Sequence, residues 1–599
     1  MSVKPADVPI RVAALTSLAL SGVLVLIGCE PGVENRDGAT TGATTGATGP
    51  AASPTTDPAA PADPVRGADL LGGHDWSHFA GATAGADGVR IRPLGRMIVK
   101  QDGTGGQPNP PVNLHGPRLE VGGDFELTAE LRGTAHATAY LQLYGELPVV
   151  YDEWRQERRS VRLGVVDGRL EVAVFDGTKA APAVTRTFGS GLPDDFTLVL
   201  ARHGDVLSFR AGDTALGELP ASGAFASSQV WFGADAALGG QGWRLAALRA
   251  RPLDGGEVTV VDTARPTDRR AADPDSLRAL AAARPRPLGV GTAVASAPLA
   301  ADPAYRELVA GQFSVLTPEN DLKPQFVQPQ PGVFDFTGGD SLVEFADANG
   351  MRVHAHTLVF GEALPRWMRE TPTERREEVM TSHVTGVAGH FKGRVAEWDV
   401  VNEPMSVQDE DYGPGRSGLR RHVWQQAMGE QYIDKAFRAA RTADPDAKLY
   451  VNEFGLESDG PRWDAFLALV KRLKQRGVPL DGVGFQAHVH ETDDHVDPAV
   501  LAGHFRALAE LGLSVRISEI DVHGEDREAQ AGQFALVAKV CAQTPSCTSY
   551  GTWGVTDRYG STAAHDSYPI APGDELMWDT RLKPKPAVAA VRGALTAAG

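Results

Sequence analysis

The sequence predicts a multidomain protein in which an all-β sandwich precedes a (β/α)8 barrel. Short runs that alternate apolar and polar residues, separated by Gly and Asp turns, fill residues 69–255. Helical patterns alternate with apolar strand patterns through residues 276–599, which is typical of βα units around a parallel barrel. A chain of 599 residues is also too long for one hydrophobic core.

Residues 1–29 have the pattern of an export signal. Lys4 and Arg11 precede an uncharged apolar stretch that ends at Cys29. The segment LIGC resembles a bacterial lipobox, in which the cysteine is lipidated and becomes the mature N-terminus. A plain single-pass anchor with a chance cysteine is the alternative. Either reading predicts an exported, membrane-anchored protein, in the periplasm or at the cell surface.

Two segments have the composition of linkers. Residues 30–68 are rich in Gly, Thr, Ala and Pro and cannot bury enough apolar surface to fold, so we expect a disordered tether. Residues 256–275 form a second, shorter linker. The net charge of −18 argues against nucleic acid or an anionic membrane surface as the main binding partner and suits neutral ligands.

The predicted sandwich contains a strong hairpin signal, Asp167-Gly168 between two alternating runs. The pattern loosely resembles concanavalin-like jelly rolls, some of which bind glycans. Trp154, Trp231 and Trp243 either form a sugar platform, which would make this domain a carbohydrate-binding module, or lie in the core. The core is the commoner place for a tryptophan in a sandwich.

Within the barrel region, WDVVNEP at 398–404 predicts a buried strand that stops at Glu403. Val400 and Val401 favour a strand, and Pro404 has no N–H with which to continue a ladder. A carboxylate at the mouth of a buried strand is unfavourable unless it is hydrogen-bonded or takes part in chemistry. A structural glutamate paired with an arginine is the alternative.

A second buried strand, ISEIDV at 517–522, also carries acids. Eight units of about 40 residues each place Glu519 three units after Glu403, at strand seven if Glu403 ends strand four. Barrel enzymes carry their catalytic residues at these C-terminal strand ends, facing one cleft. The pair of glutamates therefore predicts acid–base chemistry.

Eight short motifs identify the family that the barrel region resembles. In chain order they are GTAV at 291, TPEND at 317, HAHTLVF at 354, WDVVNEP at 398, LYVNEF at 449, GFQAH at 484, ISEID at 517 and TWGVTD at 552. Over residues 285–595 the chain resembles glycoside hydrolase family 10, whose best-known members are endo-β-1,4-xylanases. Cys541 and Cys547 fall where many members carry a disulfide; two free buried thiols are the alternative.

The resemblance implies a retaining, double-displacement mechanism. Glu403 would be the general acid/base and Glu519 the nucleophile, with their carboxyl groups about 5 to 5.5 Å apart. His488 would lie beside the nucleophile, with Asp521 fixing its tautomer and charge. Asn402 would hydrogen-bond the sugar 2-hydroxyl in the transition state.

The resemblance also implies a set of substrate-binding residues. They are Glu319, Asn320, Lys323, His356, Asn452, Gln486 and Trp553. We expect no cofactor and no metal, because the sequence has no HExxH, EF-hand or nucleotide-loop motif. The expected partners are a xylan-like polysaccharide and, through the lipid, a membrane, without nucleic acid, and the protein is expected to be a monomer.

Several positions depart from the family pattern. The family's Trp-His pair is replaced by Phe360 and Gly361, and the polar pair that follows it is replaced by Glu362 and Ala363. Further positions where an aromatic ring or its hydroxyl is missing are Pro324, Phe454 and Ser561. We therefore expect the catalytic chemistry to be kept while the sugar-binding wall is altered, with weaker activity on linear xylan and room for a decorated chain or a different β-linked sugar. The alternative function is a non-catalytic glycan-binding surface lipoprotein on a degenerate barrel.

Overall fold

The protein is described here from a computed structural model. The described residues are 67–71, 82–92, 97–98, 107–108, 118–136, 138–145, 159–176, 182–221, 223–225, 228–236, 241–261, 273–408, 411–412, 416–490, 496–560 and 574–597. The predicted export signal with Cys29, nearly all of the predicted tether, Trp154 and Ser561 lie outside these residues.

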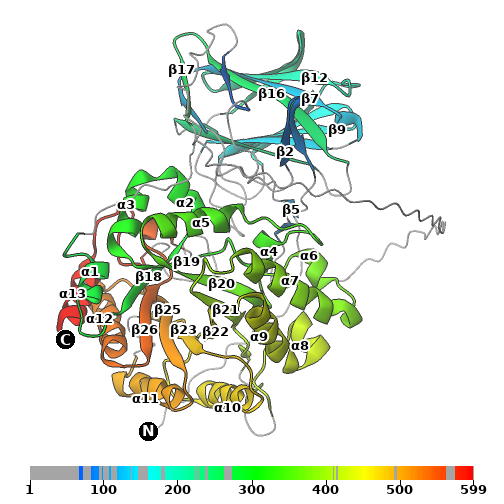
Figure 1. Ribbon diagram of the computed structural model, residues 1–599. Helices are drawn as coiled ribbons and strands as arrows, with labels where there is room; N and C mark the ends of the chain where they lie inside the picture. Colours follow the sequence, from blue (N-terminus) through cyan, green and yellow to red (C-terminus); the bar gives the residue numbers. More distant parts are fainter. Residues whose placement is uncertain are drawn as a thin grey trace, which may run out of the picture. The chain divides into compact units, whose positions relative to one another are not determined.

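The N-terminal part of the described chain consists of two large antiparallel sheets (Figure 1). The first has the order β14-β13-β12-β7-β16-β3-β2, with β1 paired to β16. Its strands are β1 (Ala68–Asp69), β2 (Ala82–Gly85), β3 (Gly88–Ile91), β7 (Phe125–Arg132), β12 (Phe196–His203), β13 (Val206–Ala211), β14 (Thr214–Pro220) and β16 (Trp243–Pro252).

The second sheet has the order β11-β10-β9-β8-β15-β6-β17. Its strands are β6 (Arg118–Gly122), β8 (Ala139–Tyr144), β9 (Ser160–Val166), β10 (Arg169–Phe175), β11 (Val184–Phe188), β15 (Gln229–Ala236) and β17 (Glu257–Val261). Asp167 and Gly168 both have positive φ in the β9–β10 hairpin, as the primed turns of tight hairpins require. A short ribbon pairs β4 (Met97–Ile98) with β5 (Gln107–Pro108).

Both sheets contribute alternate residues to one hydrophobic core. Leu127 and Leu131 of β7 belong to it, and so do Leu141 and Leu143 of β8. The expected β-sandwich is confirmed, because two sheets share this single apolar interior. Trp231 and Trp243 are both only 2% exposed, so neither forms an open sugar platform.

Eight parallel strands close into a barrel in the C-terminal part of the chain. They are β18 (Gly289–Val294), β19 (Val315–Pro318), β20 (Arg352–Phe360), β21 (Glu397–Asn402), β22 (Lys448–Glu453), β23 (Gly482–Phe485), β25 (Ser514–His523) and β26 (Cys547–Thr552). Neighbours pair in chain order, and β26 pairs with β18 to complete the circle. The predicted (β/α)8 barrel is confirmed, and the short β24 (His488–His490) adds to β25 beyond it.

Helices cover the outside of the barrel strands, as Figure 1 shows. The longer ones are α3 (Pro303–Gln312), α5 (Thr337–Ala348), α7 (Arg376–His390), α9 (Gln431–Ala443), α10 (Pro461–Gln475), α11 (Pro498–Ala509), α12 (Arg527–Gln543) and α13 (Pro586–Ala597). The shorter ones are α1 (Leu277–Ala282), α2 (Ser296–Ala301), α4 (Pro324–Val327), α6 (Arg366–Arg369) and α8 (Val423–Met428). Aspartates cap the N-termini of several of these helices, for example Asp497 before α11 and Asp526 before α12.

Because helices cover one face of each strand and the barrel interior the other, the strands are buried along most of their length. All six residues of β21 are buried, which confirms the buried strand expected from WDVVNEP. β21 is the fourth barrel strand and β25 the seventh, so Glu403 and Glu519 belong to the strands expected for them. Within the described part of the chain, no helix is long and apolar enough to cross a bilayer.

Cys541 in the last turn of α12 and Cys547 at the start of β26 form a disulfide, which confirms the predicted pairing. Both residues are buried. Replacing both by alanine should lower the free energy of unfolding by about 2 kcal/mol, because the bridge restricts a short loop of the unfolded chain. Chemical denaturation with and without a reductant measures this. The reductant should bring the wild type to the level of the variant and leave the variant unchanged; an equal effect on both proteins would contradict the prediction.

Candidate active site

Glu403 stands directly after β21, where the strand turns away from the sheet. Its φ is +51°, a conformation that a non-glycine residue adopts only when its surroundings hold it there. Its backbone N–H donates to the carbonyl of Asn452 on the next strand at 2.8 Å, and Pro404 has no N–H to extend the ladder. The carboxylate is 17% exposed, so a side chain at a buried strand end still reaches solvent.

Glu519 lies within β25 and is only 4% exposed. One of its oxygens accepts a hydrogen bond from Nδ2 of Asn452, and the other lies 3.2 Å from Nε2 of His488. Asn452 is fully buried and accepts a hydrogen bond from the Ser518 hydroxyl at 2.7 Å. Glu519 is therefore held by donors on two other strands.

His488 lies between two carboxylates. Its Nδ1 is 2.8 Å from Asp521, on the opposite side of the ring from Glu519. Burial alone would lower the pKa of His488, but the charges of Asp521 and Glu519 outweigh it and raise the pKa well above its usual range. Burial also opposes ionisation of Asp521, yet the charge of His488 and its hydrogen bond lower the Asp521 pKa to about 2. An imidazolium is thus fixed beside Glu519, which favours a carboxylate at that position.

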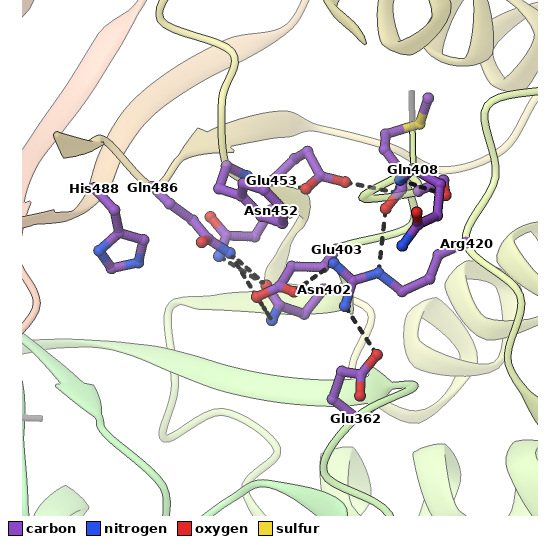
Figure 2. Close-up of polar contacts among 12 residues, drawn as sticks. Glu362, Asn402, Glu403, Gln408, Arg420, Asn452, Glu453, Gln486 and His488 are labelled. Carbon is purple, nitrogen blue, oxygen red and sulfur yellow. Dashed lines mark hydrogen bonds and ion pairs between the residues drawn. The ribbon is translucent and has the colours of Figure 1, made fainter. Parts of the chain in front are cut away.

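Three side-chain amides connect the two glutamates, and Figure 2 shows these amides around Glu403. Nδ2 of Asn402 donates to Oε1 of Glu403 at 3.3 Å, and Nε2 of Gln486 donates to the same oxygen at 3.2 Å. Asn452 donates both to Asn402 at 2.9 Å and to Glu519. The residues expected at the reaction centre therefore form one hydrogen-bonded cluster at the C-terminal ends of the strands.

The expected sugar-binding residues of the other wall also come together. The ring of Trp553 lies 5.2 Å from the ring of His356 and 5.3 Å from Nζ of Lys323. Lys323 donates to Oδ1 of Asn320 at 2.5 Å, and Nδ2 of Asn320 donates to Glu319 at 3.3 Å. Burial raises the pKa of Glu319 to about 7, although the charge of Lys323 opposes it.

His356 is fixed from beneath by a buried ionic network. Its Nδ1 lies 2.9 Å from Asp399, whose other oxygen is 2.7 Å from Nε2 of His354. Nδ1 of His354 in turn lies 2.8 Å from Glu397. Burial opposes ionisation of Asp399, yet the two histidines hold its pKa well below the usual range. The aspartate in WDVVNEP is therefore stabilised by these partners, within a strand whose six residues are all buried.

The departures from the family pattern are packed in specific ways. A Cβ atom at Gly361 would lie 2.7 Å from Cγ of His422, so the ring of His422 fills the space that a side chain there would need. Phe360 and Ala363 are buried, and Pro324 begins α4. The ring of Phe454 lies 3.9 Å from the guanidinium carbon of Arg462.

Sequence reasoning missed three charged neighbours of Glu403. Arg420 forms ion pairs with Glu403 at 3.1 Å and with Glu362 at 3.0 Å. Glu453 is fully buried, paired with Arg462 at 2.7 Å, and accepts the N–H of Met405. Burial raises the pKa of Glu453 to about 7 against the charge of Arg462, and the charge of Glu403 adds to the increase. No motif contains Arg420 or Arg462, because Arg420 comes from a connecting segment and Arg462 from α10. Glu453 lies within the LYVNEF motif, but the motif did not indicate its ion pair.

Comparison with known proteins identifies the family of the barrel. The sequence profile of "Glycosyl hydrolase family 10" matches residues 276–594. The chain belongs to glycosyl hydrolase family 10. The resemblance drawn from the eight motifs is confirmed.

Individual family 10 relatives match the same part of the chain. Endo-1,4-beta-xylanase B of Thermotoga neapolitana is 33% identical over 298 residues, which cover 48% of this chain and 82% of that protein. Beta-1,4-xylanase of Dictyoglomus thermophilum is 34% identical over 304 residues, with coverages of 47% and 82%. The crystal structure of native xylanase 10B from Thermotoga maritima has 34% identity, covers 53% of this chain and 98% of its own, and gives a TM-score of 0.49.

The raised pKa of Glu319 leads to a prediction about stability. In the unfolded chain this carboxyl ionises near pH 4.5, but in the folded protein only near pH 7. The folded state therefore binds the proton more tightly, and the free energy of unfolding falls as the pH rises through this window. Glu319→Gln removes that loss. The stability of the variant relative to wild type should improve between pH 5 and pH 8, by up to about 3 kcal/mol.

Urea denaturation of both proteins at pH 5 and pH 8 measures this difference. Glu344→Gln, on the outer helix α5, controls for the loss of one carboxylate. If the free energy of unfolding depends on pH in the same way for wild type and Glu319→Gln, burial does not raise the pKa of Glu319.

Proposed function

We propose that this family 10 protein is a retaining endo-β-1,4-xylanase that cleaves xylosidic bonds in xylan or a related β-linked polysaccharide. The observation that carries the proposal is the hydrogen-bonded cluster around Glu403 and Glu519 at the ends of the fourth and seventh barrel strands. Most glycoside hydrolases use a pair of carboxylic acids that flank the glycosidic bond to be cleaved. The similar proteins from Thermotoga neapolitana and Dictyoglomus thermophilum are named as xylanases, which supports the choice of substrate.

Glu519 is the proposed nucleophile. It must be ionised to attack the anomeric carbon, and the imidazolium of His488 and the amide of Asn452 both stabilise its carboxylate. Asp521 keeps His488 charged and correctly oriented. Once the glycosyl–enzyme bond forms, Glu519 no longer carries a negative charge, so Glu403 no longer has a second carboxylate charge nearby.

Glu403 is the proposed general acid/base. In the first step it protonates the departing sugar oxygen, and the negative charge of Glu519 favours its protonated form. After that charge is neutralised, Glu403 ionises and takes a proton from the water that hydrolyses the intermediate. Asn402, hydrogen-bonded to Glu403 and Asn452, is proposed to bind the sugar 2-hydroxyl.

Glu319, Asn320, Lys323 and His356 are proposed to bind the sugar next to the cleavage point, and Trp553 to stack on its face. Asn452 and Gln486 complete the proposed set. At neutral pH Glu319 can act as a hydrogen-bond donor as well as an acceptor, since its pKa is about 7. The altered wall around Phe360 and Gly361 is the reason to expect a decorated chain or another β-linked sugar to be accepted. Glu362 adds a carboxylate to this wall that would disfavour acidic substituents nearby, but its ion pair with Arg420 reduces that effect.

A non-catalytic, glycan-binding barrel is the alternative function. The preserved connections among Glu403, Glu519, His488 and Asp521 argue against it, because binding alone does not require an imidazolium held beside one carboxylate. Release of soluble products from a panel of β-glycans separates the two functions.

We further propose that the protein is exported and anchored to a membrane by lipid on Cys29. We also propose the division into signal (1–29), tether (30–68), sandwich (69–261), linker (262–275) and hydrolase (276–599). The sandwich extends past the expected boundary at residue 255, because β17 pairs with β6 in the second sheet. A long tether rich in Gly, Thr, Ala and Pro suits an enzyme that must reach a polymer from a membrane surface.

Replacement of each glutamate should give a different kinetic pattern. Glu519→Ala should abolish turnover of every substrate, because no covalent intermediate can form. Glu403→Ala should reduce turnover of xylo-oligosaccharides by about 10²- to 10⁴-fold. The first step on aryl xylobiosides with good leaving groups should be spared, because these need no acid. Steady-state and burst kinetics on both substrate types measure this, and equal losses for both types in Glu403→Ala would exclude the acid role.

Lipidation can be tested at Cys29 directly. Cys29→Ser should move the protein out of the membrane fraction or leave its signal unprocessed, because serine cannot accept the thioether-linked lipid. Cell fractionation and mass spectrometry of the N-terminus distinguish these outcomes. Unchanged membrane association with cleavage at another position would show that Cys29 is not the anchor.

A further inference from the structure

Arg420 connects the proposed acid/base to a second carboxylate (Figure 2). Its Nη2 lies 3.1 Å from Oε2 of Glu403, and its Nη1 donates to Oε1 of Glu362 at 3.0 Å. Its Nε donates to the carbonyl of Met405 at 3.2 Å, which fixes the plane of the guanidinium. The side chain is only 11% exposed, so solvent screens these pairs weakly.

Both carboxylate oxygens of Glu403 act as acceptors in this arrangement. Oε1 accepts from the amides of Asn402 and Gln486, and Oε2 faces Arg420. All three contacts place a donor nitrogen against Glu403, since amide N–H groups and the guanidinium donate hydrogen bonds. The first catalytic step, in contrast, requires a protonated carboxyl group at this position.

Glu362 supplies the compensating acceptor. When Glu403 carries its proton, Arg420 still has a carboxylate partner in Glu362 and is not left as an unpaired, largely buried cation. The segments that carry the pair also pack against each other, since the ring of His422 covers Gly361. Glu362 therefore makes protonation of Glu403 easier, and Arg420 makes it harder.

Other charged groups around Glu403 are themselves paired. On β22 and α10, Glu453 pairs with Arg462 at 2.7 Å. On β24 and β25, Glu519 and Asp521 pair with His488. His422 has its pKa lowered to about 3 by burial and by the charge of Arg420, so it is neutral at working pH. Among the described neighbours, the Glu362–Arg420 pair is the one in direct ionic contact with Glu403.

We propose that Glu362 and Arg420 are a pair of positioning residues that set, with opposite signs, the proton equilibrium of Glu403. Arg420 stabilises the base form that hydrolysis of the glycosyl–enzyme needs, and Glu362 takes the charge of Arg420 when Glu403 acts as an acid. The inference rests on the proposed acid/base role of Glu403.

The test is the pH dependence of kcat/KM on an unactivated xylo-oligosaccharide, whose cleavage needs the protonated acid. Arg420→Met should move the basic limb to higher pH by on the order of one unit, because the loss of the cation lets Glu403 keep its proton longer. Glu362→Gln should move the same limb to lower pH, because Arg420 then pairs with Glu403 alone. Arg420→Lys, which keeps the charge, should stay close to wild type.

An aryl xylobioside with a good leaving group gives the second readout. Its first step needs no acid, so the basic limb of kcat/KM should be absent or unmoved in every variant. Its kcat reports the second step, in which Glu403 is the base, and should fall in Arg420→Met. Arg472→Met is the matched control, since Arg472 is part of a partly buried ion pair with Glu430 at 2.7 Å between outer helices. This control should leave both pH profiles unchanged.

Opposite shifts of the basic limb in Arg420→Met and Glu362→Gln would support the inference, because a purely structural pair would not shift it in two directions. Shifts in the same direction, or none, would overturn it while Glu403→Ala still behaves as an acid/base variant. Failure of the wild type to release any product would instead overturn the proposed function. If Arg420→Met does not fold, Glu362→Gln decides alone: a limb that stays at the wild-type pH overturns the inference.

Discussion

The amide of Asn452 is the point at which the strands of the active site are tied together. This fully buried side chain on β22 donates to Asn402 at the end of the fourth strand and to Glu519 on the seventh, and it accepts from Ser518. Its space exists because Gly484 on β23 has no side chain; a Cβ atom there would lie 2.1 Å from Oδ1 of Asn452. A larger residue at either position would separate the two glutamates or leave buried polar atoms without partners.

Histidine and arginine partners allow several carboxylates to be buried close together at this end of the barrel. Glu519 and Asp521 share His488, Asp399 lies between two histidines, and Glu453 pairs with Arg462. A buried carboxylate without such a partner would be protonated at neutral pH or would destabilise the fold. Pairing does not fully offset burial at Glu319 and Glu453, whose pKa values are both raised to about 7 by burial, although Lys323 and Arg462 oppose the increase.

Where the proposed sugar-binding wall departs from the family pattern, other side chains of this protein contact the altered positions. His422 occupies the space beside Gly361, and Glu362 gains an ionic partner in Arg420. At Gly361 and Glu362 the replacement is matched by a side chain from the segment before α8, which lies about sixty residues later in the sequence. The packing around Gly361 and Glu362 therefore depends on two segments jointly.

The sequence by itself determined the fold class and the placement of Glu403 and Glu519 at the fourth and seventh strands of the barrel. Runs that alternate apolar and polar residues, with the Asp167-Gly168 turn between two of them, predict the strands of the sandwich. The valines of β21 predict a buried strand. Both signals are local, so they can be read from the sequence. The motifs of the family likewise lie within single strands. The tertiary structure alone decided that Trp231 and Trp243 are buried, that His422 faces Gly361, and that Arg420 reaches Glu403. The contacts of His422 and Arg420 join segments that are far apart in the sequence, and the direction of each side chain depends on the path of the loop that carries it. Neither periodicity nor composition carries that information.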